Sequence, residues 1–161
     1  MEHVIHQISP VFNHQSEILI LGSFPSVKSR EAQFFYHHPQ NRFWKVLASL
    51  TQDSLPQTIE EKKIFLLKHH IALWDVIASC DIQGSSDSSI KNAVPNDFSG
   101  ILKAAPIRRI YTNGVTAYKL YKKYCEPETG YPAVKLPSTS PANASYSLER
   151  LLKAWKVILP L

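Results

Sequence analysis

The sequence predicts an α/β fold, a three-layer sandwich in which a central, mainly parallel four-stranded sheet carries helices on both faces. Two observations lead to this prediction. Short apolar segments alternate along the chain with amphipathic ones, which is the order of strands and helices in a parallel sheet. The composition of the 161 residues, 44% hydrophobic and 19% charged, is typical of a globular protein. We therefore expect residues 1–161 to form one domain.

Four short segments have the pattern of β-strands. The clearest is at residues 17–22, where a continuous apolar run stops at Gly22, as in a strand that is buried on both faces. Further strands are expected at residues 70–77, 108–113 and 132–136. Parallel sheets of this class bind their ligands at the loops that follow the carboxyl ends of the strands, so a functional site is expected there.

Amphipathic segments predict the helices. They lie at residues 41–50, 60–70, 98–105 and 114–124, and a last helix follows Ser147, whose hydroxyl is expected to cap it. In the second of these helices, Ile64 and Leu67 are expected to face the core, with Phe65 as a third candidate. The serine-rich stretch at 84–92 is expected to be a surface loop.

Composition and charge indicate the cell compartment of the protein and the class of its binding partner. No apolar run approaches the ~20 residues of a membrane span, and the amino terminus lacks the features of a signal peptide. Two cysteines, Cys80 and Cys125, are too few for a disulfide framework or a four-thiolate metal site, so a cytoplasmic protein is expected. The net charge of +5 arises entirely from residues 81–161 and suits a phosphate-bearing partner.

Several kinds of site lack their sequence signatures. The histidine pairs at 37–38 and 69–70 are adjacent residues that cannot easily face one ion, and no carboxylate or thiolate accompanies them at a useful spacing, so no metal site is predicted. The chain contains neither a Gly-x-Gly-x-x-Gly motif nor a Walker sequence, which argues against a nucleotide cofactor. Ser23 and Ser138 lack the flanking glycines of a nucleophile elbow, which argues against an acyl-transfer triad.

Polar residues concentrate at the four predicted strand exits, at 22–26, 75, 113–114 and 137–143. Each has a structural and a functional interpretation. Asp75 is either a carboxylate that holds the serine-rich loop or an acceptor for a ligand, and Asn113 is either a turn residue or a donor. The segment at 138–140 is either a turn that caps the last helix or a grip on phosphates.

A long loop follows the first strand and ends at the sequence His-Pro-Gln-Asn41, directly before a helix. Asn41 is either the cap of that helix or a functional amide. Phe34, Phe35 and Tyr36 are either core residues or an aromatic face on which a planar ring stacks. The local pattern leaves both interpretations open.

Separated motifs of this chain together resemble the uracil-DNA glycosylase superfamily. They are GSFPS at 22–26 with FFYHHPQNRFW at 34–44, WDVIASCDIQGSSDSSI at 74–90, NG at 113–114 and LPSTSPAN at 136–143. The resemblance begins at about residue 18 and is greatest to the hypoxanthine-DNA (deoxyinosine) glycosylase branch. The HPxNRFW element is also similar to that of the mismatch-specific uracil glycosylases. The motifs occur in the family's order and coincide with the predicted strand exits.

The resemblance implies a DNA glycosylase of base excision repair. No amine is conspicuously placed to form a covalent intermediate, so a monofunctional enzyme is expected, and nothing in the sequence calls for a dimer or a cofactor, so a monomer without a cofactor is expected. Such an enzyme flips a deoxyinosine out of DNA that contains deaminated bases and hydrolyses its N-glycosidic bond, leaving an abasic site. In the hypoxanthine branch the catalytic residue is the asparagine of the HPxN element, here Asn41. Phe24 stands where uracil-removing relatives carry the Asn or Asp that positions or activates the attacking water, so efficient removal of uracil is not expected.

The resemblance and the chemistry of the base also assign the remaining site residues. Base binding is expected from Ser23, Phe24, Phe35, Tyr36, Asp75 and Asn113. Contacts to the DNA backbone, or a wedge into the gap left by the base, are expected from Ser26, Ser138, Thr139, Ser140, Pro141, Ala142 and Asn143. Asp75 is expected to accept a hydrogen bond from N1–H of hypoxanthine, and Asn113 or the amides of 23–26 to donate to O6. Phe35 or Tyr36 is expected to stack on the ring.

Three other functions stay open at this point. A uracil or mismatch glycosylase is opposed mainly by Phe24. A non-catalytic DNA-binding domain of the same fold would bind DNA without removing a base and would not need Asn41. An unrelated α/β enzyme that acts on a small molecule would show no salt-sensitive binding of DNA.

Overall fold

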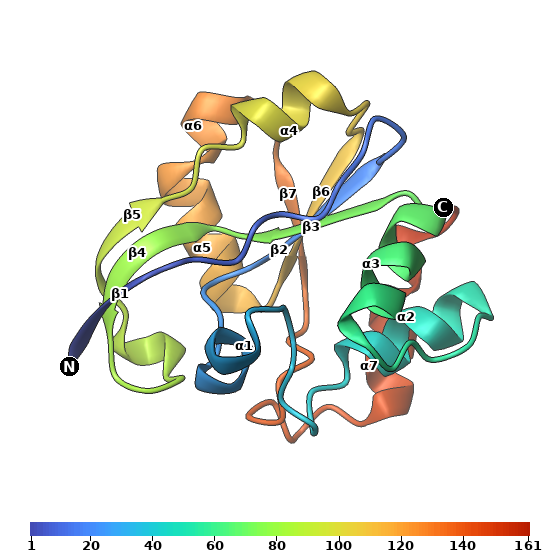
Figure 1. The fold of residues 1–161 in the computed structure, drawn as a ribbon, viewed down its shortest axis with the longest axis horizontal. Coiled ribbons are helices and arrows are strands. Elements are labelled where there is room, and N and C mark those ends of the chain that lie inside the picture. The colour runs from blue at the N-terminus through green and yellow to red at the C-terminus, as the bar shows by residue number, and fades with distance from the viewer.

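The computed structural model describes all residues from Met1 to Leu161 and is built around one parallel sheet. Its strands are β2 (Ile18–Gly22), β3 (Ile71–Asp75), β6 (Arg109–Asn113) and β7 (Ala133–Leu136), in the order β3-β2-β6-β7. Every neighbouring pair is parallel, so the carboxyl ends of the strands lie along one edge (Figure 1). The predicted α/β fold with a four-stranded parallel sheet is confirmed.

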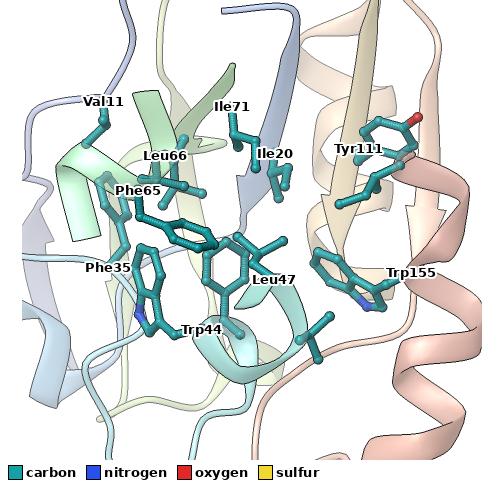
Figure 2. Packing of buried hydrophobic residues seen from close by; sticks show 14 of the residues in the cluster. Val11, Ile20, Phe35, Trp44, Leu47, Phe65, Leu66, Ile71, Tyr111 and Trp155 are labelled. Atoms are coloured by element: carbon teal, nitrogen blue, oxygen red, sulfur yellow. The ribbon is translucent and has the colours of Figure 1, made fainter. Parts of the chain in front are cut away.

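Three helices cover one face of this sheet. They are α2 (Phe43–Thr51), α3 (Ile59–Lys68) and α7 (Leu148–Trp155). Figure 2 shows the core on this side, where Leu47, Leu66 and Trp155 from the helices meet Ile20 of the sheet. These side chains are fully buried, and burial of each large apolar side chain contributes ~1.5–3 kcal/mol.

The opposite face receives Leu19 and Leu21, because side chains alternate along a strand. Helices α4 (Ser99–Ala104) and α5 (Val115–Tyr124) pack there, together with a second sheet (Figure 1). This second sheet is antiparallel, in the order β1-β4-β5, and consists of β1 (Glu2–Ile5), β4 (Ile77–Ile82) and β5 (Lys91–Pro95). Cys80 and Ile82 of β4 contribute to this core.

The sequence does not predict the second sheet, and two predicted boundaries are wrong. The strand expected at 70–77 is two strands, β3 and β4, separated by Val76, where the chain passes from one sheet to the other. The loop expected at 84–92 gives way to β5 at Lys91. β1 and β5 are short and largely exposed, so they lack the apolar pattern by which a strand is recognised.

A local signal places the start of α7. Ser147 caps α7 by accepting a hydrogen bond from Arg150 N, as predicted. The prediction for the inward side of α3 is wrong in part, because Ile64 is 59% exposed whereas Phe65 and Leu66 are buried. Residues 64–67 are all apolar, so their pattern allows more than one inward side and packing decides between them.

Four short elements complete the chain: α1 (Val27–Ala32), α6 (Glu126–Thr129) and the 3-10 turns Asp87–Ser89 and Lys156–Ile158. The sequence predicts none of them, because each is too short to show a helical period. No helix in the structure combines the length and the apolar character needed to cross a membrane.

Candidate active site

A pocket of about 990 Å³ opens at the carboxyl edge of the parallel sheet. Its walls come from the loops that follow β2, β6 and β7, from Asp75 at the end of β3 and from residues 85–88 of the serine-rich loop. Every residue that the sequence assigns to the site lines this pocket: Ser23, Phe24, Ser26, Phe35, Tyr36, Asn41, Asp75, Asn113, Ser138, Thr139, Ser140, Pro141, Ala142 and Asn143. The fold thus brings together side chains that are far apart in the sequence.

Gly22 ends β2 at a place where two polar atoms crowd against its backbone. A Cβ at this position would overlap Asp75 Oδ1 and would lie 2.8 Å from Tyr36 Oη. Asp75 ends β3 and is the direct neighbour of Gly22 in the sheet. Only glycine leaves room for both oxygens, which therefore lie close together at the pocket.

The Asp75 carboxylate is held by His6, and both side chains are almost fully buried. His6 Nδ1 accepts a hydrogen bond from Ile8 N at 3.2 Å, so the neutral ring carries its proton on Nε2 and donates it to Asp75 Oδ2 at 2.8 Å. Asp75 Oδ1 accepts no hydrogen bond from the protein and faces Gly22. The sequence does not point to His6, because it lies outside every motif and 69 positions from its partner.

Tyr36 carries a hydroxyl without a partner. Its Oη is buried and makes no hydrogen bond. Burial, and then the negative charge of Asp75, raise the pKa of the Tyr36 phenol, and the nearby side-chain amide of Asn113 opposes part of this rise, so the group stays protonated and can donate. The backbone of Tyr36 is left-handed, with φ 50°, which costs a non-glycine residue roughly 1–3 kcal/mol. Strained residues and unpaired buried donors are concentrated at ligand sites.

The predicted stacking partners differ in what they expose. Phe35 is 2% exposed and packs against Phe34, with ring centroids 5.3 Å apart, so little of its ring is free to stack on a base and that assignment is corrected. Tyr36 is half-buried; one face of its ring covers Phe43 at 4.1 Å. Phe24 packs edge-on against His6 at 5.9 Å and forms an apolar wall. Because one face of the Tyr36 ring is already covered, the hydroxyl beside Gly22 is the part of this side chain that can bind a base.

Asn41 lies two residues before the start of α2, and the cap position belongs to Arg42, so Asn41 is not the helix cap. Its Oδ1 accepts a hydrogen bond from Phe43 N at 3.0 Å, which supports the first turn of the helix. The same oxygen accepts a second hydrogen bond from Thr139 Oγ1 at 2.8 Å. Since the amide oxygen is engaged twice, Nδ2 is the part of Asn41 that is free to act in the pocket, and it can only donate.

Thr139 and Asn113 form a buried reciprocal pair behind Asn41. Thr139 N donates to Asn113 Oδ1, and Asn113 Nδ2 donates to Thr139 Oγ1, both at 3.0 Å. Thr139 is fully buried and all its polar groups are used, so the expectation that it grips a DNA phosphate is wrong. The side-chain oxygen of Asn113 already accepts a hydrogen bond from Thr139 N, so only Nδ2 of Asn113 can bind a ligand.

Arg42 ties down the loop at 138–146. Its guanidinium donates to the carbonyl oxygens of Ser140 and Asn143, at 3.2 and 3.1 Å, and to that of Tyr146. Ala142 is exposed at the tip of this loop. Arg42 has no acidic partner, so its positive charge adds to the attraction of the site for a polyanion. The sequence does not single out Arg42.

The serine-rich loop is docked against the rest of the pocket. Val27 N donates to Ser85 Oγ at 2.9 Å, and Arg30 Nη2 donates to Gly84 O at 2.7 Å, so both contacts attach the loop to α1. Ser26 caps this helix by accepting from Ser29 N at 3.2 Å. A serine-rich composition carries no signal for such docking, which explains why a plain surface loop is predicted.

The docked loop places a second carboxyl group, Asp87, at the pocket. Ser23 Oγ donates to Asp87 Oδ1 at 2.8 Å. Burial by the surrounding protein and the charge of Asp75 raise the pKa of Asp87, and the hydrogen bond from Ser23 opposes the rise. No three His, Cys, Asp or Glu side chains of the structure are arranged to hold a metal ion.

Comparison with known proteins agrees with this architecture. A family model of the uracil DNA glycosylase superfamily matches residues 9–159. A hypoxanthine DNA glycosylase from Methanosarcina acetivorans is 39% identical over 142 residues, which cover 87% of this chain and 89% of that protein. One from Methanosarcina barkeri is 34% identical over 153 residues, covering 91% and 92%.

A solved structure is similar over the same length. The solution NMR structure of a candidate uracil DNA glycosylase from Methanosarcina acetivorans has a TM-score of 0.81 and 34% sequence identity, covering 96% of both chains. The family match therefore extends over nearly the whole sequence and the whole fold. The chain belongs to the uracil-DNA glycosylase superfamily.

Proposed function

We propose that this protein is a DNA glycosylase that removes hypoxanthine from deoxyinosine and leaves an abasic site for base excision repair. The two similar Methanosarcina proteins are both named hypoxanthine DNA glycosylases. One observation carries the proposal: a free acceptor, Asp75 Oδ1, and a free donor, Tyr36 Oη, lie together beside Gly22 in the pocket.

This pair of atoms matches the edge of hypoxanthine. The base presents N1–H, a donor, next to O6, an acceptor, so Asp75 Oδ1 accepts from N1–H and Tyr36 Oη donates to O6. Adenine presents the opposite pattern and would leave both buried groups unpaired, at a cost of ~1–3 kcal/mol each. The sequence suggests Asn113 or the backbone amides of 23–26 as the donor to O6. We propose Tyr36 for this role instead.

Guanine shares N1–H and O6 with hypoxanthine and must be rejected at an earlier step. The target nucleotide is stacked in DNA and has to be flipped out before its base reaches Asp75. Flipping costs least for a mismatched or damaged base. Deoxyinosine opposite thymine is poorly paired and is therefore extruded more readily than guanine opposite cytosine.

The loop at 138–143 supports the flipped state. In the proposed complex, Pro141, Ala142 and Asn143 fill the gap left by the base, because they lie at the tip of the loop that Arg42 holds in place. Contacts to the DNA backbone come from groups that border the same pocket, Ser26, Ser138 and Ser140.

The bond between C1′ and N9 breaks through a state with positive charge on the sugar and negative charge on the base. Asn41 Nδ2 donates to the attacking water and orients it, since Oδ1 is held by Phe43 and Thr139. Lys135 is the one amine that lines the pocket, and its Nζ lies over the ring of Tyr118 at 5.7 Å. The proposed reaction is hydrolysis by water without a Schiff base.

We also propose that residues 1–161 act as a single-domain monomer in the cytoplasm, without a metal or a nucleotide cofactor. All walls of the pocket come from one chain, so no second copy is needed to complete it. Cys80 and Cys125 are free and buried, which suits a reducing compartment.

The experiment that tests this function measures base release from labelled oligonucleotides that contain one deoxyinosine, uracil or xanthine. After incubation with protein, alkali cleaves the DNA at abasic sites. We expect cleavage at deoxyinosine by the wild type and a severe loss in Asn41→Ala. Gln40→Ala is the matched control, because Gln40 is an exposed amide next to Asn41 that does not line the pocket.

Three outcomes would contradict the proposal in different ways. Dominant cleavage at uracil would mean that Phe24 does not prevent uracil removal and that the substrate is wrong. Binding of DNA without cleavage of any lesion would identify a binding domain rather than an enzyme. Equal loss of activity in Gln40→Ala and Asn41→Ala would deny Asn41 its special role.

A further inference from the structure

The proposed hydrolysis requires a group that accepts a proton from the attacking water. Asn41 is unsuitable, because its amide is not basic and its oxygen already accepts two hydrogen bonds. His38 also lines the pocket, but its Nδ1 accepts from Gln40 N at 3.1 Å, so its Nε2 carries the proton of the neutral ring and donates. Two carboxyl groups remain, those of Asp75 and Asp87.

These two carboxyl groups lie at different depths. Asp75 is 3% exposed, at the end of a central strand and against Gly22. Asp87 belongs to an exposed turn at the mouth of the pocket. A flipped nucleotide enters with its base first, so the base reaches the deeper carboxylate and the deoxyribose stays beside the outer one. The geometry therefore separates a group for the base from a group for the sugar.

The outer carboxylate is held in a defined place. Ser23 Oγ donates to Asp87 Oδ1 at 2.8 Å, and Oδ2 makes no hydrogen bond with the protein. The turn that carries Asp87 is closed by a hydrogen bond of 2.9 Å from Gln83 N to Ser89 Oγ and is attached to α1 by Arg30. One oxygen is thus anchored and the other is presented to the pocket, as a general base requires.

From this geometry we propose that Asp87 is the general base of the reaction and that its free Oδ2 takes a proton from the water that attacks C1′ of the flipped nucleotide. The inference rests on the proposed function. A bond forms between the water oxygen and C1′ while the C1′–N9 bond breaks, and its electron pair leaves with the base. The water proton passes to Asp87, which returns it to solvent, and the released base takes up a proton from solvent.

The charged surroundings of Asp87 set the pH dependence of this step. Burial of its carboxyl group by the surrounding protein raises the pKa of Asp87, the hydrogen bond from Ser23 lowers it, and the charge of Asp75 at the end of β3 raises it further. Arg30 on α1 is bonded to the loop that carries Asp87, and His38 and Lys135 are the basic residues that line the pocket. Asp87 must be ionised to act as a general base. The rate of base release therefore falls as the pH drops through the raised pKa of Asp87, which lies above the ~3.9 of an ordinary aspartate.

The test compares single-turnover release of hypoxanthine by the wild type, Asp87→Asn and Asp81→Asn across a range of pH. Asp87→Asn keeps the shape and the oxygen that accepts from Ser23 but is not a base. We expect the rate of hypoxanthine release by this variant to be lower than that of the wild type by roughly a hundredfold or more. We also expect that the rate of this variant no longer decreases as the pH is lowered. Its affinity for a duplex that carries a tetrahydrofuran abasic analogue should stay unchanged. Asp81, which binds His3 and Asn92 outside the pocket, should be replaceable without effect on the rate.

The outcomes separate this inference from the proposed function. If the wild type releases hypoxanthine and Asp87→Asn does so at a comparable rate, the general base is not Asp87 and the proposed function stands. A fall in rate that is matched by weaker binding of the abasic duplex would show a structural role and overturn the inference. If the wild type releases no base from any substrate, the proposed function fails and the inference fails with it.

Discussion

The hydroxyl of Thr139 donates a 2.8 Å hydrogen bond to Oδ1 of Asn41, joining two residues that are 98 positions apart. The same hydroxyl accepts a hydrogen bond from Asn113 Nδ2 at 3.0 Å. A threonine hydroxyl has one proton, so its bond from Asn113 leaves that proton for Asn41. The orientation of the candidate catalytic amide is therefore decided by a buried network, which turns its oxygen away and leaves its nitrogen for the substrate.

Thr139→Val removes this hydroxyl with little change of shape. Asn41 loses one of its two donors and Asn113 Nδ2 loses its acceptor, so we expect slower base release together with a loss of ~1–3 kcal/mol in the free energy of unfolding. Single-turnover kinetics and urea unfolding measure the two effects. Thr112→Val is the control, because Thr112 Oγ1 is buried without a partner and its removal should not destabilise the protein. Equal losses in both variants would refute the network.

Gly22→Ala should abolish hypoxanthine release in a protein that still folds. The added Cβ displaces Asp75 Oδ1 and Tyr36 Oη, the two atoms assigned to the base. Gly100→Ala is the matched control, since a Cβ there meets nothing within 4 Å and lies in α4, where alanine is preferred by ~1 kcal/mol. Activity of Gly22→Ala close to that of the wild type would mean that the base is bound elsewhere in the pocket.

His6→Phe should destabilise the protein by at least ~1–3 kcal/mol, because it leaves the buried carboxylate of Asp75 without its hydrogen-bond donor. Adding Asp75→Asn removes the buried charge, so the double variant should recover part of that loss in urea unfolding. His3→Phe serves as the control, since His3 is 61% exposed in its side chain and its bond to Asp81 contributes little. A double variant less stable than the sum of the single effects would contradict the assigned pairing.

Arg42→Lys keeps the positive charge but loses the planar group that bonds three carbonyl oxygens of the loop at 138–146. We expect weaker binding of an abasic duplex with an unchanged dependence of log Kd on log salt concentration, because the number of charges stays the same. Fluorescence anisotropy at several salt concentrations gives both quantities. Arg109→Lys, an exposed substitution at the amino end of β6, should change neither. A reduced salt slope would indicate that Arg42 binds phosphate directly.

Strand β2, the start of α7 and the position of the pocket are features that the local sequence predicts correctly. The apolar run of β2 indicates a strand buried on both faces, since each of its residues must face one of two cores. Ser147 begins α7 because its hydroxyl needs only the amide three residues later. Strand exits rich in polar residues also indicate where the pocket forms, because parallel strands end along one edge.

Contacts between distant segments are not predictable in this way. Asp87 meets Ser23 across 64 positions, and His6 meets Asp75 across 69, with no local pattern in either case. The second sheet escapes prediction because its outer strands are exposed and gain their hydrogen bonds only from β4. Its position matters for the proposed reaction, since the turn that carries Asp87 connects β4 to β5.

The sequence by itself determined the parallel sheet and the edge at which polar residues gather, because these follow from periodicity and local order, and its motifs resemble the family to which the chain belongs. Only the tertiary structure decided what each side chain can do there. It buries Thr139 behind Asn41, pairs His6 with Asp75 and leaves one oxygen of Asp87 free. The physical reason is that the availability of a donor or an acceptor depends on which partners the fold has already supplied.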